Sequence, residues 1–325
     1  MAIKIQAAAL ILPPSRFRED FERRLRLAVP NLNLVVLDPI LAGSNDSRAL
    51  SEFDALFTFG PFLSDEAIAG AKRLRWVQCL GTGVDGIVDR PTLGTQVWVT
   101  SARGVHAASV SETALALMMA LSRDIPKLVK SQMAHKWSPG PAQLLSGCTV
   151  GILGVGLISE ALAKRCRSFD MRVEGITRRT SAPYFDRLYP YGEIETAVAN
   201  FDYFVLLADL TPETRNVVDT SVIRAMKTDA FLVNVGRGGV VDESAMVAAL
   251  ESRQLRAAAL DVFAVEPLLP ESPLWDLPNV LISPHSAGQH KDYARDVVPI
   301  IAANHNALSA GQFDAISNVV RRPSM

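Results

Sequence analysis

Long hydrophobic runs are missing from the sequence, and so is an excess of charge of either sign. No apolar run reaches the roughly 18 residues that a membrane-spanning helix needs. Of 325 residues, 33 are basic and 34 are acidic, and the formal net charge is −1. The charges interleave, as they do between Arg16 and Arg26, so neither a nucleic-acid surface nor an anionic-membrane patch is indicated. We therefore expect no nucleic-acid partner and no membrane partner.

Cysteine is also scarce. Cys79, Cys148 and Cys166 lie far apart and lack any spacing typical of metal ligands. An odd, sparse set argues against a disulfide framework and favours a reducing compartment. The apolar stretch at residues 5–12 is short and charges follow it closely, which favours a first β-strand over a signal peptide. We expect a cytoplasmic protein without a metal site.

Most of the chain alternates short apolar runs with amphipathic segments. Residues 1–100 show this alternation, and a second series begins at Cys148. The second series contains expected strands at residues 150–153, 172–176, 203–207, 230–235, 257–261 and 280–283. Helical segments fill most of the gaps, a pattern typical of a doubly wound dinucleotide-binding domain. The sequence therefore predicts an α/β fold with two doubly wound parallel-sheet domains.

A strongly apolar helix is expected between the two series, at about residues 110–121. Ser109 precedes it and is of a type that caps helix N-termini, and Glu112 is expected in the first turn. Apolar residues occupy nearly the whole circumference of this helix, which indicates that it is buried.

The strongest local signal follows the first strand of the second series. Gly154 and Gly156 lie between this apolar strand and an amphipathic helix. The first glycine permits a tight turn, the second lets a pyrophosphate approach the backbone, and the helix N-terminus offers N–H groups to the anion. Ser159 replaces the usual third glycine, so we expect a slightly wider helix placement with the site retained. The alternative is a purely structural βα turn. The expected cofactor contacts are Gly154, Val155, Gly156, Leu157 and Ile158.

The end of the next strand bears on the choice of dinucleotide. NAD binders usually place Asp or Glu there, about 20 residues on, to hold the ribose hydroxyls. This strand ends near Thr177 without an acid, and Arg178 and Arg179 follow. Guanidinium groups bind the 2′-phosphate that a carboxylate would repel. The sequence therefore predicts that NADP(H) is preferred and NAD(H) is the second choice, unless the arginines form only an exposed basic loop.

Charged and titratable residues follow three later strands. Arg237 lies beyond the strand expected at 230–235, and His285 lies beyond the last strand. Asp261 and Glu266 follow the strand between them. Carboxyl strand ends of an open parallel sheet face the ligand crevice, so these side chains are expected beside the cofactor. Reduction of a 2-keto acid needs a proton donor, which His supplies near neutral pH. A nearby Glu raises the pKa of the imidazole, and Arg binds the substrate carboxylate and polarises the carbonyl.

Several stretches resemble the D-isomer-specific 2-hydroxyacid dehydrogenases. They are the glycine turn, Leu210-Thr-Pro-Glu-Thr-Arg215, Asn234-Val-Gly-Arg-Gly-Gly-Val-Val-Asp-Glu243, Ala258-Ala-Leu-Asp-Val-Phe with Glu-Pro267, and Ser272-Pro-Leu-Trp-Asp-Leu-Pro-Asn-Val with Ser-Pro-His285. The similarity runs from about Leu74 to the C-terminus, in the family's order and spacing. Departures are Ser159, Thr177 and Asp209, the last at a position where the family commonly has Pro.

The resemblance implies roles for these residues. Arg237, Glu266 and His285 match the family's catalytic Arg, Glu and His. Asp261 matches an acid that contacts the nicotinamide end of the cofactor, and Val235 lines that part of the cleft. The family also implies a homodimer.

The resemblance further implies a second domain that binds the substrate. A loop after an early strand is expected to receive the substrate carboxylate on its backbone N–H groups, although an ordinary tight turn is the alternative. The loop residues are Gly81, Thr82 and Gly83. This flavodoxin-like domain is expected to be discontinuous, at residues 1–101 and 289–325, with the Rossmann domain at 102–288.

Three functions stay open at this point. The first is reduction of a small 2-keto acid such as glyoxylate or hydroxypyruvate to the D-2-hydroxy acid. The second is a phosphite or other small-acid dehydrogenase of the same fold. Formate enzymes of this fold pair the His with Gln, so Glu266 fits the hydroxyacid group better. The third is a non-catalytic nucleotide-sensing protein like the co-repressors that share the fold.

Overall fold

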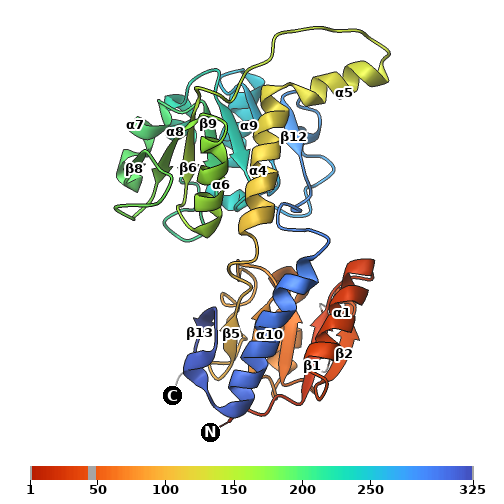
Figure 1. Cartoon of the computed structure of the whole chain (residues 1–325). Helices are drawn as coiled ribbons and strands as arrows, with labels where there is room; N and C mark the ends of the chain where they lie inside the picture. The colour runs from red at the N-terminus through yellow and green to blue at the C-terminus, as the bar shows by residue number, and fades with distance from the viewer. Residues whose placement is uncertain (1, 43–48, 324–325) are drawn as a thin grey trace. The chain divides into compact units, whose positions relative to one another are not determined.

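The structure, a computed structural model, describes residues 2–42 and 49–323 (Figure 1). The chain divides into two compact units, one formed by residues 1–105 and 290–325 and the other by residues 106–289. The first unit is discontinuous, because the C-terminal end of the chain returns to it. The breaks fall after Val105 and Gln289, whereas the sequence suggested breaks after residues 101 and 288.

A six-stranded sheet forms the first unit. Its order is β13-β5-β4-β3-β1-β2, and every neighbouring pair is parallel except β13 with β5. The strands are β1 (Ala7–Ile11), β2 (Asn33–Leu37), β3 (Ala55–Thr58), β4 (Trp76–Cys79), β5 (Trp98–Thr100) and β13 (Val319–Arg321). The two central strands β3 and β4 are buried along their whole length, as expected for a parallel sheet covered on both faces.

The helices of the first unit come from both ends of the chain. They are α1 (Arg16–Ala28), α2 (Pro39–Ala42), α3 (Asp65–Gly70) and α10 (Tyr293–Ala310), with 3-10 turns at Gly60–Phe62 and Phe313–Ala315. The helices α1 and α10 lie side by side (Figure 1). The ring of Phe17 lies 5.6 Å from that of Tyr293, centroid to centroid, so both helices contribute to one apolar layer.

A seven-stranded, fully parallel sheet forms the second unit. Its order is β12-β11-β10-β9-β6-β7-β8. The strands are β6 (Thr149–Leu153), β7 (Arg172–Ile176), β8 (Arg187–Tyr189), β9 (Tyr203–Leu206), β10 (Phe231–Asn234), β11 (Ala257–Leu260) and β12 (Val280–Ile282). The strand order reverses at β6, and ligands of doubly wound sheets bind at such a switch point.

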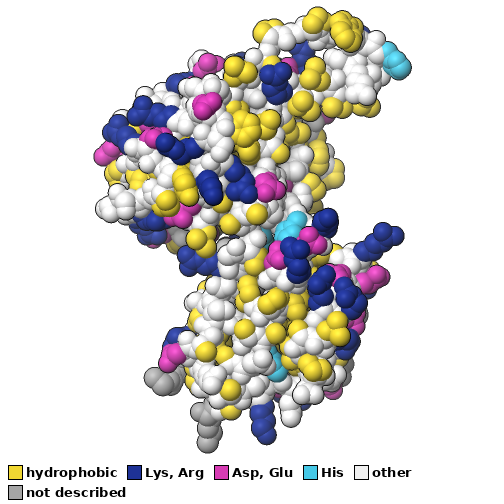
Figure 2. Space-filling model, in the orientation of Figure 1, with side chains coloured by type: hydrophobic (Ala, Val, Ile, Leu, Met, Phe, Trp, Pro, Cys, Tyr) yellow, Lys and Arg dark blue, Asp and Glu magenta, His cyan; other side chains and the backbone are white. Residues whose placement is uncertain are grey.

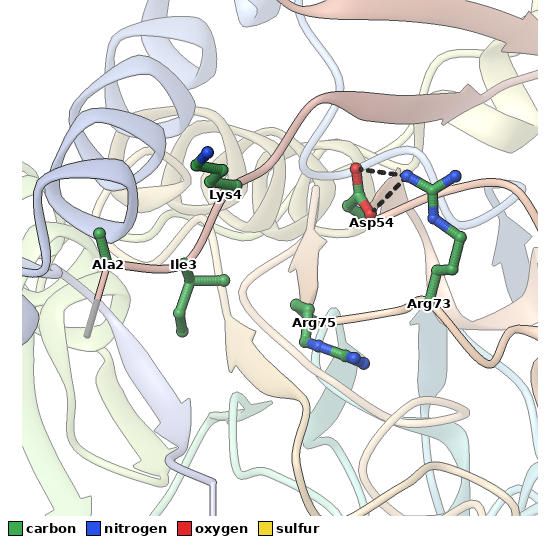
Figure 3. A pocket seen from close by; sticks show the side chains of 6 residues that line it. All are labelled: Ala2, Ile3, Lys4, Asp54, Arg73 and Arg75. Carbon is green, nitrogen blue, oxygen red and sulfur yellow. Dashed lines mark hydrogen bonds and ion pairs between the residues drawn. The ribbon is translucent and has the colours of Figure 1, made fainter.

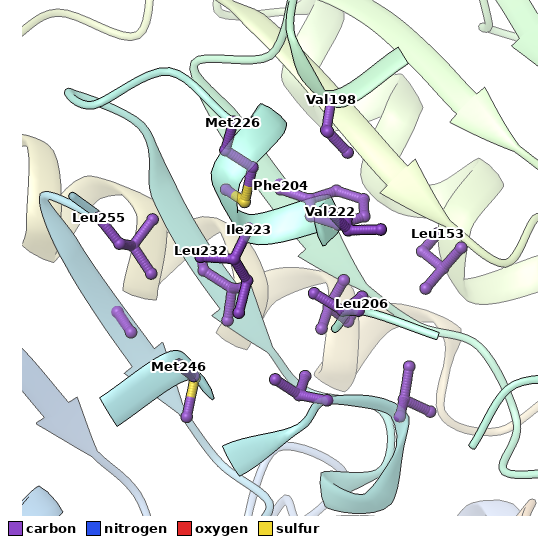
Figure 4. Close-up of a cluster of buried hydrophobic side chains, with 14 of the residues drawn as sticks. Leu153, Val198, Phe204, Leu206, Val222, Ile223, Met226, Leu232, Met246 and Leu255 are labelled. Atoms are coloured by element: carbon purple, nitrogen blue, oxygen red, sulfur yellow. The ribbon is translucent and has the colours of Figure 1, made fainter. Parts of the chain in front are cut away.

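Helices lie on both faces of the second sheet. They are α4 (Ala107–Ser122), α5 (Ile125–Met133), α6 (Leu157–Arg167), α7 (Ile194–Val198), α8 (Thr220–Ala225) and α9 (Glu243–Glu251), with 3-10 turns at Tyr191–Glu193, Gly238–Val240 and Pro273–Trp275. The helices α7, α8 and α9 bury an apolar cluster that includes Val198, Ile223 and Met246 against strand residues such as Leu206 (Figure 4). The helices α4 and α6 pack together within a separate cluster.

Two features of the helices differ from the sequence expectation. The helix α4 begins at Ala107, so Ser109 lies inside it, where its hydroxyl donates to the carbonyl of His106 at 3.4 Å. The N-cap assigned to Ser109 was therefore wrong, and Glu112 lies beyond the first turn. The helix α5 was not expected from the sequence, and none of its residues is buried. Among the described residues, no helix has the length and hydropathy to cross a bilayer.

Candidate active site

The glycine turn joins β6 to α6. Gly154 has φ +85°, and a Cβ on it would lie 2.6 Å from the Cα of Ala208 on the neighbouring β9 connection. Gly156 is the N-cap of α6, and a Cβ there would meet no atom within 4 Å. The hydroxyl of Ser159 donates to the carbonyl of Gly154 at 2.5 Å, so the serine in place of the third glycine closes the turn. The open backbone and the helix N-terminus fit a pyrophosphate.

The two glycines are expected to respond differently to alanine. Gly154→Ala would place a Cβ against backbone at a positive φ, so we expect a loss of about 1–3 kcal/mol in the free energy of unfolding. Gly156→Ala has room in the free protein and should leave stability unchanged. It should weaken cofactor binding if the pyrophosphate approaches this glycine as the sequence predicts. Urea unfolding and cofactor titration of both variants separate these effects. Equal stability losses would contradict the distinction.

The stretch after β7 forms a short turn that carries two arginines. Thr177 is buried, its N–H donates to the carbonyl of Tyr189 at 2.9 Å, and its hydroxyl accepts the N–H of Arg179 at 3.2 Å. Arg178 is exposed. The Thr177 side chain thus shapes the turn, and its assignment as a cofactor-binding residue stays a prediction. No carboxylate ends this strand, whose last residue is Ile176.

Three neighbouring strands bring the predicted charged residues to one edge of the sheet. The strands β10, β11 and β12 are adjacent and parallel, and their carboxyl ends precede Arg237, Glu266 and His285 respectively. The Nδ1 of His285 lies 2.6 Å from Oε2 of Glu266. The other oxygen of Glu266 accepts the N–H of Phe263 at 2.9 Å. The carboxylate therefore fixes the imidazole orientation and leaves Nε2 as the second titratable nitrogen.

The His285 backbone is held in a left-handed conformation, with φ +49°. Its N–H donates to the carbonyl of Asp261 at 2.8 Å. The Asp261 carboxylate, 1% exposed, accepts the hydroxyl of Ser283 at 2.6 Å and the N–H groups of Ser286 and Ala287 at 2.9 Å each. Asp261 therefore braces the loop that carries His285, a role that the sequence did not suggest. The expected contact of Asp261 with the nicotinamide stays a prediction.

The side chain of Asn234 holds the loop that carries Arg237 in place. The side-chain amide of Asn234, 1% exposed at the end of β10, donates to the carbonyl of Arg237 at 3.1 Å and accepts the N–H of Gly236 at 3.2 Å. A Cβ on Gly238 would lie 1.9 Å from the carbonyl carbon of Phe263, so the Arg237 loop lies directly against the loop that leads to Glu266. The role of Asn234 was not predicted from the sequence, although a polar residue at the end of a buried apolar strand is a detectable signal.

Electrostatic interactions couple His285, Glu266 and Arg237. The hydrogen bond that His285 donates to Glu266 raises the pKa of His285 above its ordinary value, and burial and the Arg237 charge oppose this rise. Burial would raise the pKa of Glu266, but hydrogen bonds from His285 and the N–H of Phe263 hold it below its usual range. Glu266 is therefore ionised when the imidazole is protonated, and His285 keeps its proton to a higher pH than a free imidazole does.

The remaining predicted residues have different positions. Val235 is 6% exposed and lies in the apolar cluster with α4. Leu157 is half exposed at the start of α6, beside Ile158. The loop after β4 lies in the first unit, where the carbonyl of Gly81 accepts the N–H of Ala102 at 2.9 Å and that of Gly83 accepts the thiol of Cys79 at 3.1 Å.

A cavity of about 350 Å³ in the first unit contains none of the predicted site residues. Its lining is Ala2, Ile3, Lys4, Asp54, Arg73 and Arg75 (Figure 3). The carboxylate of Asp54 is fully engaged there, because it accepts the N–H groups of Gln6 and Ala7 at 3.0 Å each and binds Arg73 at 3.1 Å. The Asp54 carboxylate thus links the start of β1 to the connection between β3 and β4.

A glycine turn at the switch point of a doubly wound sheet, with Arg, Glu and His at adjacent strand ends, defines a nicotinamide-dinucleotide-dependent dehydrogenase. Comparisons with known proteins narrow this class. Residues 115–287 match the family described as D-isomer specific 2-hydroxyacid dehydrogenase, NAD binding domain. The chain belongs to this family, which confirms the resemblance, the fold class and the enzymatic activity expected from the sequence.

Individual relatives are similar over most of the chain. A protein of Staphylococcus haemolyticus named as a 2-hydroxyacid dehydrogenase is 33% identical over 82% of this chain and 83% of its own length. Glyoxylate/hydroxypyruvate reductase B of Pectobacterium atrosepticum is 32% identical over 82% of this chain and 86% of its own length. The crystal structure of a D-isomer specific 2-hydroxyacid dehydrogenase from Xanthobacter autotrophicus in complex with NADPH and MES is 27% identical, with a TM-score of 0.82 over 98% of each chain.

Proposed function

We propose that the protein reduces a small 2-keto acid, of the glyoxylate or hydroxypyruvate type, to the D-2-hydroxy acid with NADPH. The observation that carries this proposal is the 2.6 Å contact between His285 Nδ1 and Glu266, beside Arg237 at the carboxyl edge of the sheet. Similarity to glyoxylate/hydroxypyruvate reductase B supports the substrate class.

His285 and Arg237 have different roles in the proposed reduction. When bound, the nicotinamide supplies the hydride to the carbonyl carbon. The imidazolium of His285 donates a proton from Nε2 to the carbonyl oxygen, since Nδ1 is engaged by Glu266. The guanidinium of Arg237 binds the substrate carboxylate and polarises the carbonyl. In the reverse direction, neutral His285 accepts the alcohol proton.

The second unit would bind the cofactor and the first unit the substrate carboxylate. Gly154 and Gly156 would receive the pyrophosphate, with Val155, Leu157 and Ile158 beside them, and Val235 and Asp261 would lie at the nicotinamide end. The backbone of Gly81, Thr82 and Gly83 would bind the carboxylate in the first unit. An odd and sparse set of three widely separated cysteines supports a cytoplasmic location.

The preference for NADP(H) rests on the end of β7. Arg178 and Arg179 follow a strand without a terminal carboxylate, and guanidinium groups bind a 2′-phosphate well. We expect a higher kcat/KM with NADPH than with NADH, and a loss of NADPH affinity in Arg178→Ala. Equal or better kcat/KM with NADH would overturn the preference.

A substrate panel tests the reaction itself. Glyoxylate, hydroxypyruvate, pyruvate, longer 2-keto acids and, for oxidation, phosphite are assayed with NADPH and with NADH. The proposal expects oxidation of NADPH that depends on a 2-keto acid, with the D-isomer as product. Turnover of phosphite alone, or cofactor binding without turnover of any compound, would refute it.

Glu266→Gln is expected to change the pH dependence of reduction. Reduction needs protonated His285, so kcat/KM falls as the pH rises through the imidazole pKa. Glu266 raises that pKa, and an uncharged amide raises it less. The alkaline limb of the kcat/KM profile should therefore move to lower pH in Glu266→Gln. An alkaline limb that stays in place would show that Glu266 does not set the imidazole pKa.

We also propose a homodimer that involves α5 and the segment after it. None of the helix is buried, and apolar side chains gather along this part of the second unit (Figure 2). The large exposed ones are Ile125, Leu128, Val129, Met133 and Trp137, the last 96% exposed. Contiguous apolar surface of this kind marks an interface, and a second copy of the chain is the partner that the family implies.

A charged residue in this apolar surface is expected to break the dimer. Leu128→Glu should convert the protein from dimer to monomer, because an unpaired carboxylate cannot be buried between two copies. Light scattering after size-exclusion chromatography measures the mass. The control is Leu27→Glu, which replaces an equally apolar side chain, 73% exposed in α1, and should stay dimeric. A monomeric native protein, or a Leu128→Glu variant with unchanged mass, would contradict the proposal.

A further inference from the structure

The two arginines after β7 make different contacts. The guanidinium of Arg179 lies 2.7 Å from Oε1 of Glu160 and donates to the carbonyl of Val155 at 3.4 Å. Val155 is the middle residue of the glycine turn, and Glu160 lies in the first turn of α6. Arg179 is therefore held against the turn that would bind the pyrophosphate, with its charge compensated by a carboxylate.

Arg178 has no such restraint. It is exposed, and neither a hydrogen bond nor an ion pair joins its side chain to any residue that the structure describes. Burial raises the pKa of Tyr191, and the Arg178 charge partly opposes this rise. The pKa of Glu213 is lowered mainly by a hydrogen bond from Thr211, and the Arg178 charge adds to this effect. The backbone N–H of Arg179 donates a hydrogen bond to the Thr177 hydroxyl, which holds the turn over residues 177–179 in place. Only one of the two guanidinium groups is thus available to a new anion without breaking an existing ion pair.

The Glu160–Arg179 pair is only partly exposed to solvent, with 22% of the Glu160 side chain and 44% of the Arg179 side chain accessible. Water screens a pair of this kind less than a fully exposed one, so the pair keeps part of its Coulomb energy. A phosphate that recruits Arg179 must compete with Glu160, and it also meets the negative charge of Glu160 itself.

We propose that Glu160 is a specificity-determining residue that limits discrimination between NADPH and NADH by holding Arg179 in an ion pair. This inference rests on the proposed binding of NADP(H) at the end of β7. It assigns the 2′-phosphate contact to Arg178 in the native protein and makes Arg179 a second contact that Glu160 withholds. Glu160→Gln releases Arg179 and removes one negative charge near the phosphate.

Two effects of this substitution can be separated. Glu160 lies at the N-terminus of α6, where its charge repels the pyrophosphate that both cofactors contain. Removing that charge strengthens NADH and NADPH binding alike. The release of Arg179 acts only on the 2′-phosphate, which NADH lacks. The ratio of the two dissociation constants therefore cancels the effect on the pyrophosphate, and the Arg179→Ala background separates the release of Arg179 from the loss of the Glu160 charge near the 2′-phosphate.

The test is calorimetric titration of the full-length protein with NADPH and with NADH, without substrate. In Glu160→Gln, the ratio of the NADH to the NADPH dissociation constant should rise about 5- to 10-fold. In the Arg179→Ala background, Glu160→Gln should raise that ratio by a smaller factor, because only the loss of the Glu160 charge near the 2′-phosphate remains and the released group is absent. The control Glu251→Gln removes one carboxylate from the end of α9 and should not alter the ratio.

The outcomes distinguish this inference from the proposed cofactor preference. If Arg178→Ala leaves NADPH affinity unchanged, the preference for NADP(H) at this strand end fails. If Arg178→Ala weakens NADPH binding but the ratio in Glu160→Gln is unchanged or falls, the specificity role of Glu160 is refuted. The same holds if the ratio rises equally in the Arg179→Ala background. Thermal melting of each variant checks that the fold is retained.

Discussion

His285→Asn is expected to lower kcat about 10²- to 10⁴-fold while leaving NADPH binding intact, because it removes the proton donor and leaves the glycine turn untouched. Asparagine is preferred to alanine at this position. The backbone of His285 has φ +49°, which Asn tolerates better than Ala. The loop that Asp261 braces should therefore keep its conformation, so the loss reports on chemistry. Steady-state kinetics and NADPH titration measure the two effects.

The matched control for this variant is His135→Asn. His135 also has a positive φ, of 53°, and is exposed after α5, away from the carboxyl edge of the sheet. Its replacement should leave kcat unchanged. A His285→Asn or His285→Ala variant with near-normal kcat would refute the assignment of His285 as proton donor.

Arg237→Lys is expected to lower kcat/KM for the keto acid about 10²- to 10³-fold, although the charge is kept. A guanidinium binds a carboxylate through two parallel N–H groups and polarises a carbonyl in the same plane, which a single ammonium cannot do. The loss should appear both as a higher KM and as a lower kcat, because Arg237 acts on the bound substrate and on the charge that develops in reduction. NADPH affinity should change little.

Arg224→Lys is the control for the arginine variant. Arg224 is exposed in the last turn of α8, and its replacement should preserve kcat and KM. If Arg237→Lys raises KM but leaves kcat unchanged, Arg237 only binds the substrate carboxylate, and the proposed polarisation of the carbonyl is wrong.

The order of elements in the second unit was predictable because strands buried on both faces appear as apolar runs between amphipathic segments. The glycine turn and the strand-end positions of Arg237 and His285 were visible for the same reason. Short edge strands such as β8 and β13 gave no comparable signal, since three residues are too few for a period to appear. The helix α5 was also missed, although its apolar residues recur at helical spacing, and only the structure shows that none of them is buried.

The family, the residue types of the candidate site and their order along the chain follow from sequence, because motifs of contiguous residues encode them. The tertiary structure decided which of these residues meet and what each one does. The 2.6 Å contact of His285 with Glu266 joins loops after two different strands. Asp261 accepts hydrogen bonds from the loop that carries His285, and Arg179 forms an ion pair with Glu160. Both interactions join segments that lie apart in the sequence, so only the tertiary structure shows them. A sequence pattern shows which charged and polar side chains the chain contains. Only the folded structure shows which of them already form hydrogen bonds or ion pairs with one another.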